Sequence, residues 1–388
     1  MPRTIQYTRL ASAGAARRGR VETPHGSFET PAFMPVGTQG TVKGLTPDDL
    51  QESGAQIVLA NTYHLWVRPG HELIRSLGGL HRFMGWSGPI LTDSGGYQVF
   101  SLAAFAKVKE EGVRFRSPVD GQWRLLTPEL AVEIQEALGV DIAMAFDECV
   151  EHPASFERVR TSVARTTRWL HRCIAARKRP EQTALFGIVQ GGVYPELRAA
   201  HAAELTALDL DGYAIGGLSV GESKAELFEM ARYTAPLLPE DRPRYLMGVG
   251  YPIDIVEAVI AGVDLFDCVI PTRSARFGGL FTSAGRIHIK NARFRDDPRP
   301  LDEKCVCYTC ARFSRAYLRH LFTSGEVLAP RLLTLHNVTF YQGLVAGIRK
   351  AIEAGPDALA ALRERAVAWT APYVEPTANS GAPTDADA

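Results

Sequence analysis

Short apolar runs alternate with longer amphipathic segments along most of this chain, and this alternation restricts its possible folds more than any other feature. Short apolar runs bounded by turn residues predict buried strands, whereas apolar residues three or four positions apart predict helices. The predicted strands are residues 56–60, 89–92, 142–146, 185–189, 213–215, 245–247 and 264–266. The predicted helices between them include residues 128–138, 156–177, 195–207 and 223–237.

Repeated strand–helix units of this kind predict a parallel sheet, which is either a closed eight-stranded barrel or an open, doubly wound sheet. A doubly wound sheet that binds a dinucleotide carries a glycine-rich fingerprint after its first strand. The chain has no such fingerprint, which favours the barrel. With 388 residues, it is long enough for one barrel of about 250 residues and an insertion.

Each apolar run ends in a polar or glycine-containing cluster: residues 61–64, 93–96, 147–149, 190–192, 216–217, 248–250 and 267. In a parallel barrel, side chains just beyond the strands converge on one face, where catalysis takes place. These clusters therefore predict one composite pocket. The alternative is that they only cap the following helices and form turns. Asp267 argues against that alternative, because it lies in a mostly apolar run where an unpaired carboxylate is costly.

Three cysteines, Cys305, Cys307 and Cys310, lie within six residues of one another. Zinc prefers four nitrogen or sulfur ligands in a tetrahedron, and closely spaced cysteines can chelate it from one turn. For the fourth ligand we select His336, which lies beyond a predicted helix over 313–322 that lets the chain fold back. Four protein ligands leave no open position, so the predicted zinc is structural. The alternative is a group of reduced cysteines without metal.

The formal net charge is zero, which argues against a non-specific nucleic-acid binder. Residues 271–331, however, contain twelve Lys and Arg against five acidic residues. This excess predicts a local basic face for an anionic polymer, unless acidic helices nearby balance it. No apolar run approaches the roughly 18 residues that span a bilayer. The N-terminus lacks a signal-peptide core, and clustered cysteines suit a reducing compartment, so we expect a cytoplasmic protein without a membrane partner.

Long, ordered motifs between about Phe28 and Ile352 resemble those of the bacterial tRNA-guanine transglycosylases, the queuine tRNA-ribosyltransferase family. They are TPAFMPVGTQGTVKGLTP, NTYHLWVRPG, PILTDSGGYQVFSL, AFDECVEHP, GIVQGG, YAIGGLSVGE, YLMGVG, DLFDCVIPTR, GRIHIKNARF and CVCYTCARFSRAYLRHL. The resemblance implies an α/β fold, a (β/α)8 TIM barrel with a zinc-binding subdomain inserted near the C-terminus. We expect a barrel core over 1–276, the zinc-binding subdomain over 277–345, a helical segment over 346–372 that closes the barrel, and a disordered tail over 373–388. The sequence also predicts helices over 338–353 and 358–370.

The resemblance also implies an activity: replacement of guanine at the wobble position of GUN anticodons by 7-aminomethyl-7-deazaguanine, a step of queuosine biosynthesis. Asp267 matches the family's nucleophile, which forms a covalent aspartyl–RNA intermediate, and Asp93 matches its general acid/base. Retaining exchange at a glycosidic carbon does require two carboxyl groups. Their spacing in the sequence alone permits either aspartate to attack.

The resemblance further implies a base-binding site, in which Tyr97 and Met247 flank the purine; ordinary core packing is the alternative for these two. The residues expected to bind the base are Asp93, Ser94, Tyr97, Asp147, Gln190, Gly216, Gly217, Leu218 and Met247. The residues expected to contact the RNA are Gly248, Val249, Arg273 and Arg276. The resemblance identifies the zinc ligands as the same Cys305, Cys307, Cys310 and His336.

The expected partners are a tRNA anticodon loop, a deazaguanine base and a second copy of the chain in a homodimer. Two aromatic groups are candidates for the dimer contact. One is formed by Phe313, Tyr317 and His320 and the other by Phe83, Met84 and Trp86; alternatively, both are buried within the monomer. A rival interpretation is a non-catalytic RNA-binding or partner subunit on the same fold. Such a subunit is expected to lack one of the three carboxylates at 93, 147 and 267, all of which are present.

Overall fold

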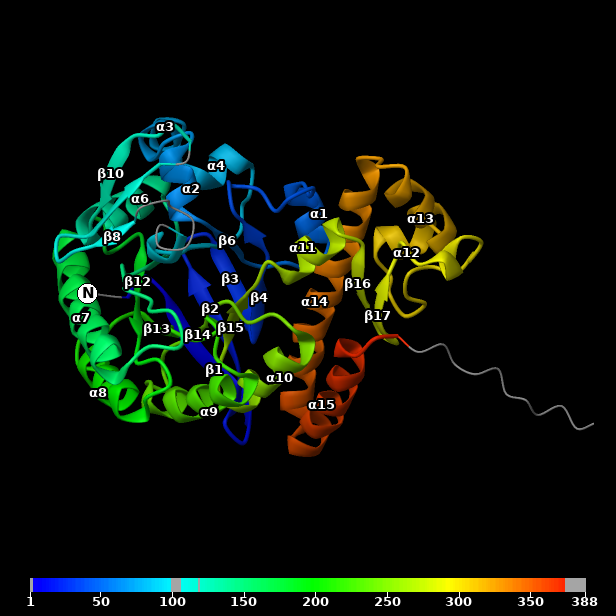
Figure 1. Ribbon diagram of the computed structural model, residues 1–388. Coiled ribbons are helices and arrows are strands. Elements are labelled where there is room, and N and C mark those ends of the chain that lie inside the picture. The colour runs from blue at the N-terminus through cyan, green and yellow to red at the C-terminus, as the bar shows by residue number, and fades with distance from the viewer. Residues whose placement is uncertain (1–2, 99–105, 118, 374–388) are drawn as a thin grey trace, which may run out of the picture.

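The computed structural model describes residues 3–98, 106–117 and 119–373. The predicted tail therefore lies outside the described residues, apart from Tyr373. A ring of parallel strands forms the centre of the molecule, in the order β4-β15-β14-β13-β12-β11-β7-β6-β5 (Figure 1). Their bounds are β4 Ala32–Met34, β5 Val36–Gly37, β6 Val58–Ala60, β7 Ile90–Thr92, β11 Ile142–Met144, β12 Ala184–Val189, β13 Gly212–Ile215, β14 Arg244–Leu246 and β15 Leu265–Asp267.

The segments β4 and β5 are two halves of one strand, separated by Pro35. β4 pairs with β15, and β5 pairs with β6, so the two halves join the ends of the sheet. Proline has no N–H to give to a ladder, but its carbonyl still accepts a hydrogen bond from Leu59 at 3.1 Å. The predicted (β/α)8 barrel is confirmed. Its first strand was missed, because prolines at 31 and 35 interrupt the apolar run.

The main helices surround the strands on the outside of the barrel (Figure 1). They are α6 Pro128–Leu138, α7 Phe156–Ala176, α8 Pro195–Thr206, α9 Lys224–Thr234 and α10 Pro252–Ile260. Side chains of Thr127, Ser155 and Ser223 cap the N-termini of α6, α7 and α9. Four short helices precede β7 and were not predicted, because six residues are too few to show a period: α1 Pro47–Glu52, α2 Thr62–Val67, α3 His71–Ser76 and α4 Gly79–Met84.

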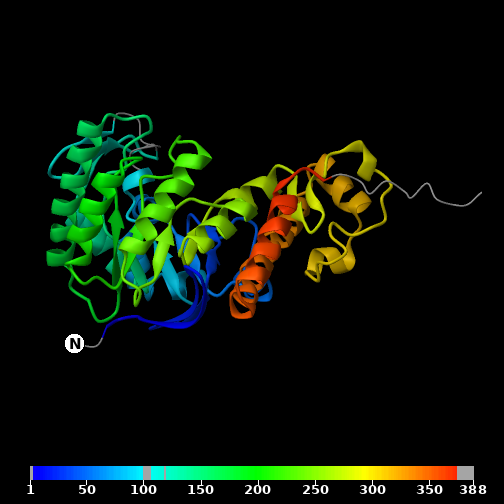
Figure 2. The same ribbon diagram turned by 90° about the horizontal axis from the view of Figure 1, so that it is seen from below.

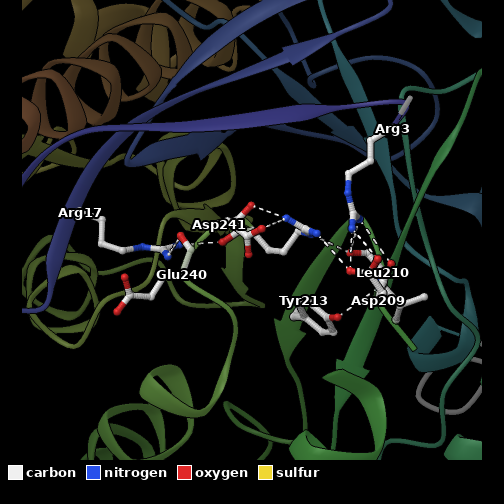
Figure 3. A network of polar contacts seen from close by, with 8 residues as sticks. Arg3, Arg17, Asp209, Leu210, Tyr213, Glu240 and Asp241 are labelled. Carbon is white, nitrogen blue, oxygen red and sulfur yellow. Dashed lines mark hydrogen bonds and ion pairs between the residues drawn. The ribbon is translucent and has the colours of Figure 1, made fainter. Parts of the chain in front are cut away.

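Two three-stranded antiparallel sheets are added to the barrel. The first consists of β1 Gln6–Ala13, β2 Ala16–Thr23 and β3 Gly26–Thr30, and the second consists of β8 Lys107–Val108, β9 Val113–Arg116 and β10 Trp123–Leu126. The first lies at the amino ends of the barrel strands. There the Arg17 guanidinium pairs with Asp264, just before β15, and donates to the Glu240 carbonyl at 2.9 Å (Figure 3). Arg3 pairs with Asp209 at 2.6 Å in the same network. Val21 and Phe28 of this sheet also pack in the apolar interior of the barrel, so both apolar and polar contacts close this end.

The C-terminal elements lie to one side of the barrel (Figures 1 and 2). They are α11 Ile270–Arg276, β16 Gly279–Thr282, β17 Gly285–His288, α12 Tyr308–Arg312, α13 Arg315–Thr323, α14 Leu328–Ala354 and α15 Pro356–Thr370. Helix α14 begins ten residues before the predicted start at 338. Pro330 is tolerated in its first turn, where N–H groups have no helical acceptor, and buried polar residues such as Thr334 obscure its apolar pattern.

Helix α14 contributes to two hydrophobic cores. Leu332 and Leu333 pack in the core of the C-terminal elements, whereas Tyr341 and Val345 pack in the main barrel core. One continuous helix therefore connects the predicted segments 277–345 and 346–372. None of the helices in the described part of the chain has the length and apolarity to cross a membrane.

The two candidate dimer patches differ in exposure. In the second group, Trp86 is 3% exposed and its indole N–H donates to the Pro89 carbonyl at 3.1 Å, so Trp86 belongs to the core. Of the two alternatives left open for this group, burial within the monomer therefore holds for Trp86. Phe83 beside it is exposed. In the first group, Tyr317 and His320 are exposed on α13.

Candidate active site

A cavity of about 380 Å³ opens at the carboxyl ends of the barrel strands. Its walls come from segments that follow seven of the strands, as the polar clusters in the sequence predicted. The expected site residues that line it are Asp93, Ser94, Tyr97, Asp147, Gln190, Gly216, Gly217, Leu218, Met247, Gly248 and Asp267. The structure thus brings together both predicted catalytic residues and every residue expected to bind the base.

Asp93 follows β7 directly and is buried. Its Oδ1 accepts hydrogen bonds from the backbone N–H of Thr62 at 2.9 Å and of Gly95 at 3.2 Å. Its Oδ2 accepts from the side-chain amides of Asn61 and Gln98, the latter at 2.6 Å. Burial outweighs these neutral donors and raises the pKa of Asp93 to about 6. A carboxyl group with this pKa can release and take up a proton near neutral pH.

Asp267 ends β15 and is bonded differently. Its Oδ1 accepts from the Tyr245 hydroxyl at 2.6 Å and from the Gly248 N–H at 2.9 Å. Among the described residues no hydrogen bond reaches Oδ2, so this oxygen is free to approach a molecule in the cavity. Burial raises the pKa of Asp267, although both bonds favour the charged form. The two carboxyl groups therefore differ: both oxygens of Asp93 accept hydrogen bonds, whereas only one oxygen of Asp267 does.

Asp147 follows β11 and faces the same cavity. Its Oδ2 accepts from the Gln190 side chain at 2.6 Å, and its Oδ1 accepts from the Ser94 hydroxyl at 3.3 Å. Burial raises the pKa of Asp147 to about 6. No cation pairs with Asp147 among the described residues, so its charge depends on neutral donors until a ligand binds. A carboxylate in this setting suits a ligand that offers two adjacent N–H groups.

The Gly216–Gly217 pair brings backbone close to these polar side chains. A Cβ on Gly216 would lie 2.5 Å from the Ile188 side chain and 2.8 Å from the Gln190 amide. Gly217 has φ +63° and passes so close to the Gln190 amide oxygen that a Cβ would collide with it. Glycine therefore suits both positions, and its small size lets the backbone of this turn line the cavity.

Tyr97 and Met247 also line the cavity. Tyr97 is 50% exposed, so ordinary core packing does not account for it. Met247 is half-buried and packs on the apolar interior of the barrel as well as facing the cavity. These two side chains supply an aromatic surface and a polarisable surface to a flat ligand.

The four residues expected to contact RNA do not all lie in one place. Arg273 is exposed on α11, whereas Arg276 is half-buried, donates to the Thr272 carbonyl at 3.2 Å and lines a separate cavity of about 760 Å³. Val249 is 3% exposed, and its side chain packs in the main core. After the turn at Gly248, with φ +75°, the chain returns to the interior at Val249.

Three lining residues that bond the catalytic aspartates were not predicted as site residues: Asn61, Gln98 and Tyr245. Each donates a hydrogen bond to Asp93 or Asp267. Asn61 lies in a cluster that the sequence had marked as a strand end. Tyr245 lies two residues before Met247, and alternate residues of a strand share a face, which is the only signal that pointed to it.

The three cysteines and His336 meet on the C-terminal side of the molecule, with all their ligand atoms within 4.8 Å of one another. The sulfur atoms of Cys310 and Cys307 lie 3.3 and 3.8 Å from Nδ1 of His336. These separations are close to the roughly 3.5 Å expected between neighbouring ligands of a tetrahedral zinc ion. Nε2 of His336 lies 2.8 Å from the Phe281 carbonyl oxygen, so Nε2 carries the proton and Nδ1 is free to bind metal. The donor set fits zinc.

Comparison with known proteins agrees with this geometry. A sequence model of the family described as Queuine tRNA-ribosyltransferase matches residues 12–369. A protein of that name from Bacillus licheniformis is 54% identical over 351 residues, which cover 90% of this chain and 92% of that protein. A protein of the same name from Methylobacillus flagellatus is 56% identical over 351 residues, which cover 90% of this chain and 95% of that protein. The chain therefore belongs to the queuine tRNA-ribosyltransferase family of enzymes.

Proposed function

We propose that the enzyme exchanges guanine in tRNA for 7-aminomethyl-7-deazaguanine through a covalent aspartyl–RNA intermediate. The observation that carries this proposal is the unequal bonding of two carboxyl groups in one cavity. Asp267 has an oxygen free for attack, whereas Asp93 is held by four neutral donors and has a pKa of about 6. Retaining exchange at a sugar carbon needs one group of each kind.

In the first half-reaction, Oδ2 of ionised Asp267 attacks C1′ of the ribose and forms an ester-like C–O bond. The bond from C1′ to N9 of guanine breaks, and its electron pair stays with the purine. Protonated Asp93 gives its proton to the purine, which leaves as neutral guanine. The Tyr245 hydroxyl and the Gly248 N–H hold Oδ1 of Asp267 during the attack.

In the second half-reaction, the incoming base occupies the place of guanine. Asp93 removes the proton from its N9, and that nitrogen attacks C1′. The bond between C1′ and Asp267 breaks and returns the electron pair to the carboxylate. The sugar carbon is inverted twice, so its configuration is retained, and no redox or phosphate donor is consumed.

The base-binding residues suit a guanine-like ring. Asp147 accepts from the ring N–H and the exocyclic amine, while Gln190 and the Gly217–Leu218 backbone donate to the exocyclic oxygen. Tyr97 and Met247 flank the ring. Val220 lines the cavity near this turn and leaves little room for a larger 7-substituent such as that of queuine.

The target is the wobble guanine of GUN anticodons, which makes the reaction a step of queuosine biosynthesis in the cytoplasm. Arg273 is exposed one helical turn after Val269, which lines the cavity, and it suits a phosphate of the anticodon loop. We further propose that the enzyme acts as a homodimer in which the exposed Tyr317 contributes to the interface. Sedimentation at micromolar concentration is expected to show a dimer that Tyr317→Glu weakens; a monomer with full activity would refute this.

The cysteines and His336 would hold one structural zinc ion per chain. Since four protein ligands fill the tetrahedron, the ion would fix the fold of the C-terminal elements and take no part in the exchange. Elemental analysis is expected to give about one zinc per chain. Cys307→Ser is expected to lower both the zinc content and the melting temperature, and a variant that kept its melting temperature without zinc would contradict the assignment.

The decisive experiment incubates the enzyme with radiolabelled tRNA and separates the products under denaturing conditions. A GUN-anticodon tRNA is expected to form an adduct that survives denaturation, and added 7-aminomethyl-7-deazaguanine is expected to release it as modified tRNA. The matched control is the same tRNA with adenine at the wobble position, which is expected to form no adduct. A folded, zinc-loaded enzyme that exchanges no base in any GUN tRNA would overturn the proposal.

A further inference from the structure

A fully buried arginine lies behind the base-binding turns. Arg198 is on α8 and has no solvent exposure, yet it forms no ion pair among the described residues. Burial lowers the pKa of Arg198 to about 10, so it remains charged at neutral pH. Burying a cation without a carboxylate partner is costly, and such groups cluster at functional sites. Neither proposed half-reaction uses this residue.

Arg198 binds backbone carbonyls from two neighbouring loops of the cavity. Its Nε donates to the Gly192 carbonyl at 2.7 Å, in the loop that follows Gln190. One terminal nitrogen donates to the Gly216 carbonyl at 3.0 Å, in the loop that follows β13. The other terminal nitrogen, Nη1, has no hydrogen-bond partner within the described part of the chain. The guanidinium thus connects the loops that carry Gln190 and Gly217.

The bond to Gly216 determines where the next N–H points. A trans peptide is planar, so the N–H of Gly217 points away from the Gly216 carbonyl and hence away from Arg198. It points instead toward Cys149, which lines the cavity: burial raises the pKa of the Cys149 thiol to about 12, and a hydrogen bond from the Gly217 backbone opposes that rise. Glycines on both sides of this peptide allow it to rotate, unless something holds its carbonyl.

The same helix also holds Gln190. One turn after Arg198, Nδ1 of His201 accepts a hydrogen bond from the Gln190 backbone N–H at 2.9 Å. His201 is fully buried, and burial lowers its pKa to about 4, so its ring is neutral. Helix α8 therefore fixes the backbone of both groups proposed to donate to the exocyclic oxygen of the base.

We propose that Arg198 is a positioning residue for base recognition, which holds the Gly216 carbonyl so that the Gly217 N–H points at the exocyclic oxygen of the purine. This inference rests on the proposed function of the cavity. A guanidinium is needed because its planar fork reaches both loops at once, whereas an ammonium group reaches one of them. A purine that lacks the exocyclic oxygen should not sense the loss of Arg198.

The test measures how tightly guanine and 2-aminopurine, which has no oxygen at position 6, compete in the exchange reaction. Arg198→Met is expected to weaken guanine about 10- to 100-fold, as expected for a lost hydrogen bond in a dry site, and to change 2-aminopurine by less than about two-fold. Arg198→Lys is expected to give an intermediate loss for guanine. Equal losses for the two purines, or no loss for either, would overturn the proposal.

Arg244 offers a matched control, because it is also a buried arginine that donates to backbone carbonyls, including that of Gly262 at 3.4 Å. It lies on β14, toward the amino ends of the strands. Arg244→Met is expected to lower the melting temperature as Arg198→Met does, but to leave the guanine to 2-aminopurine ratio unchanged. If Arg198→Met does not fold, Arg198→Lys carries the test. A wild-type enzyme that does not bind guanine would refute the proposed function, and not the role of Arg198 within it.

Discussion

The two ends of strand β15 carry the same side chain in different electrostatic settings. At the amino end, Asp264 is fully buried and pairs with the Arg17 cation, and it also accepts from the backbone N–H of Arg244 at 2.7 Å. At the carboxyl end, Asp267 accepts only neutral donors, one from Tyr245 and one from Gly248. The first carboxylate is compensated within the protein, whereas the second is left with an oxygen for a ligand.

The same contrast holds for β11. Asp141 precedes the strand and accepts from the Ile90 N–H at 2.8 Å and from the rings of His25 and His81 at 2.9 and 3.2 Å. Burial opposes the charge, but these bonds prevail and lower the pKa of Asp141. Asp147 follows the strand, and burial raises its pKa to about 6. Acids at the amino ends thus stabilise the fold, and acids at the carboxyl ends are poised for chemistry.

The largest effects are expected when the aspartates at the two ends of β15 are replaced by asparagine, one at a time. Asp267→Asn removes the nucleophile and is expected to lower kcat by about 10⁴-fold or more. Asp264→Asn leaves Arg17 buried without its partner and is expected to cost about 3–5 kcal/mol in the free energy of unfolding. Adduct formation measures the loss of the nucleophile, and unfolding in denaturant measures the loss of stability. An active Asp267→Asn enzyme, or an inactive but folded Asp264→Asn enzyme, would break the contrast.

A smaller loss is expected when the base-binding carboxylate is neutralised. Asp147→Asn keeps the shape of the side chain but offers an amide where the ligand presents N–H groups, so guanine is expected to bind about 100-fold more weakly, as a charge-assisted pair is worth about 2–3 kcal/mol. Competition in the exchange assay measures this. Asp141→Asn, at the other end of the barrel, serves as the control and is expected to leave guanine affinity unchanged.

Asp141→Asn is instead expected to lower the free energy of unfolding by about 2 kcal/mol. The amide accepts fewer hydrogen bonds than the carboxylate, so one of the N–H groups now bonded to Asp141 is left buried without an acceptor. Urea denaturation at pH 7 measures the change. An Asp141→Asn protein as stable as the wild type would show that the acid at this end of β11 is not structural.

The last prediction concerns pH, and it has opposite signs at the two ends of β11. The pKa of Asp147 is about 6 in the folded protein and about 4 in an unfolded chain. Folding therefore favours its protonated form, and ionisation lowers the free energy of unfolding as the pH rises from about 4 to about 6. Two pKa units correspond to about 2.7 kcal/mol, so the stability of Asp147→Asn relative to the wild type is expected to rise by roughly 2–3 kcal/mol between pH 4 and pH 8.

Asp141 follows the opposite rule. Its folded pKa lies below the unfolded value, so its contribution is present above about pH 4 and is lost as the pH falls through the folded pKa. The stability difference between wild type and Asp141→Asn is therefore expected to shrink only in acid. Melting curves of both Asn variants from pH 3 to pH 8 test the two signs together, and parallel curves would remove the distinction between the ends.

Local pattern in the sequence was sufficient for most of the architecture. Seven barrel strands, the main helices and the cysteine–histidine group follow from periodicity and spacing, which depend on neighbouring residues. Two features did not follow. The first strand is split by Pro35, and helix α14 starts earlier than its apolar period indicates. In each case tertiary contacts outweigh the local signal.

The sequence alone determined which residues follow the strands, and hence which carboxyl groups share the cavity. It did not determine what each carboxylate accepts. The partners of Asp93 and Asp267, such as Asn61 and Tyr245, come from other strands, and Arg198 reaches its carbonyls from a helix outside the barrel. The pKa of a buried acid depends on desolvation and on donors contributed by distant segments. Only the closed barrel brings those segments together, so only the tertiary structure distinguishes an acid that stabilises from an acid that reacts.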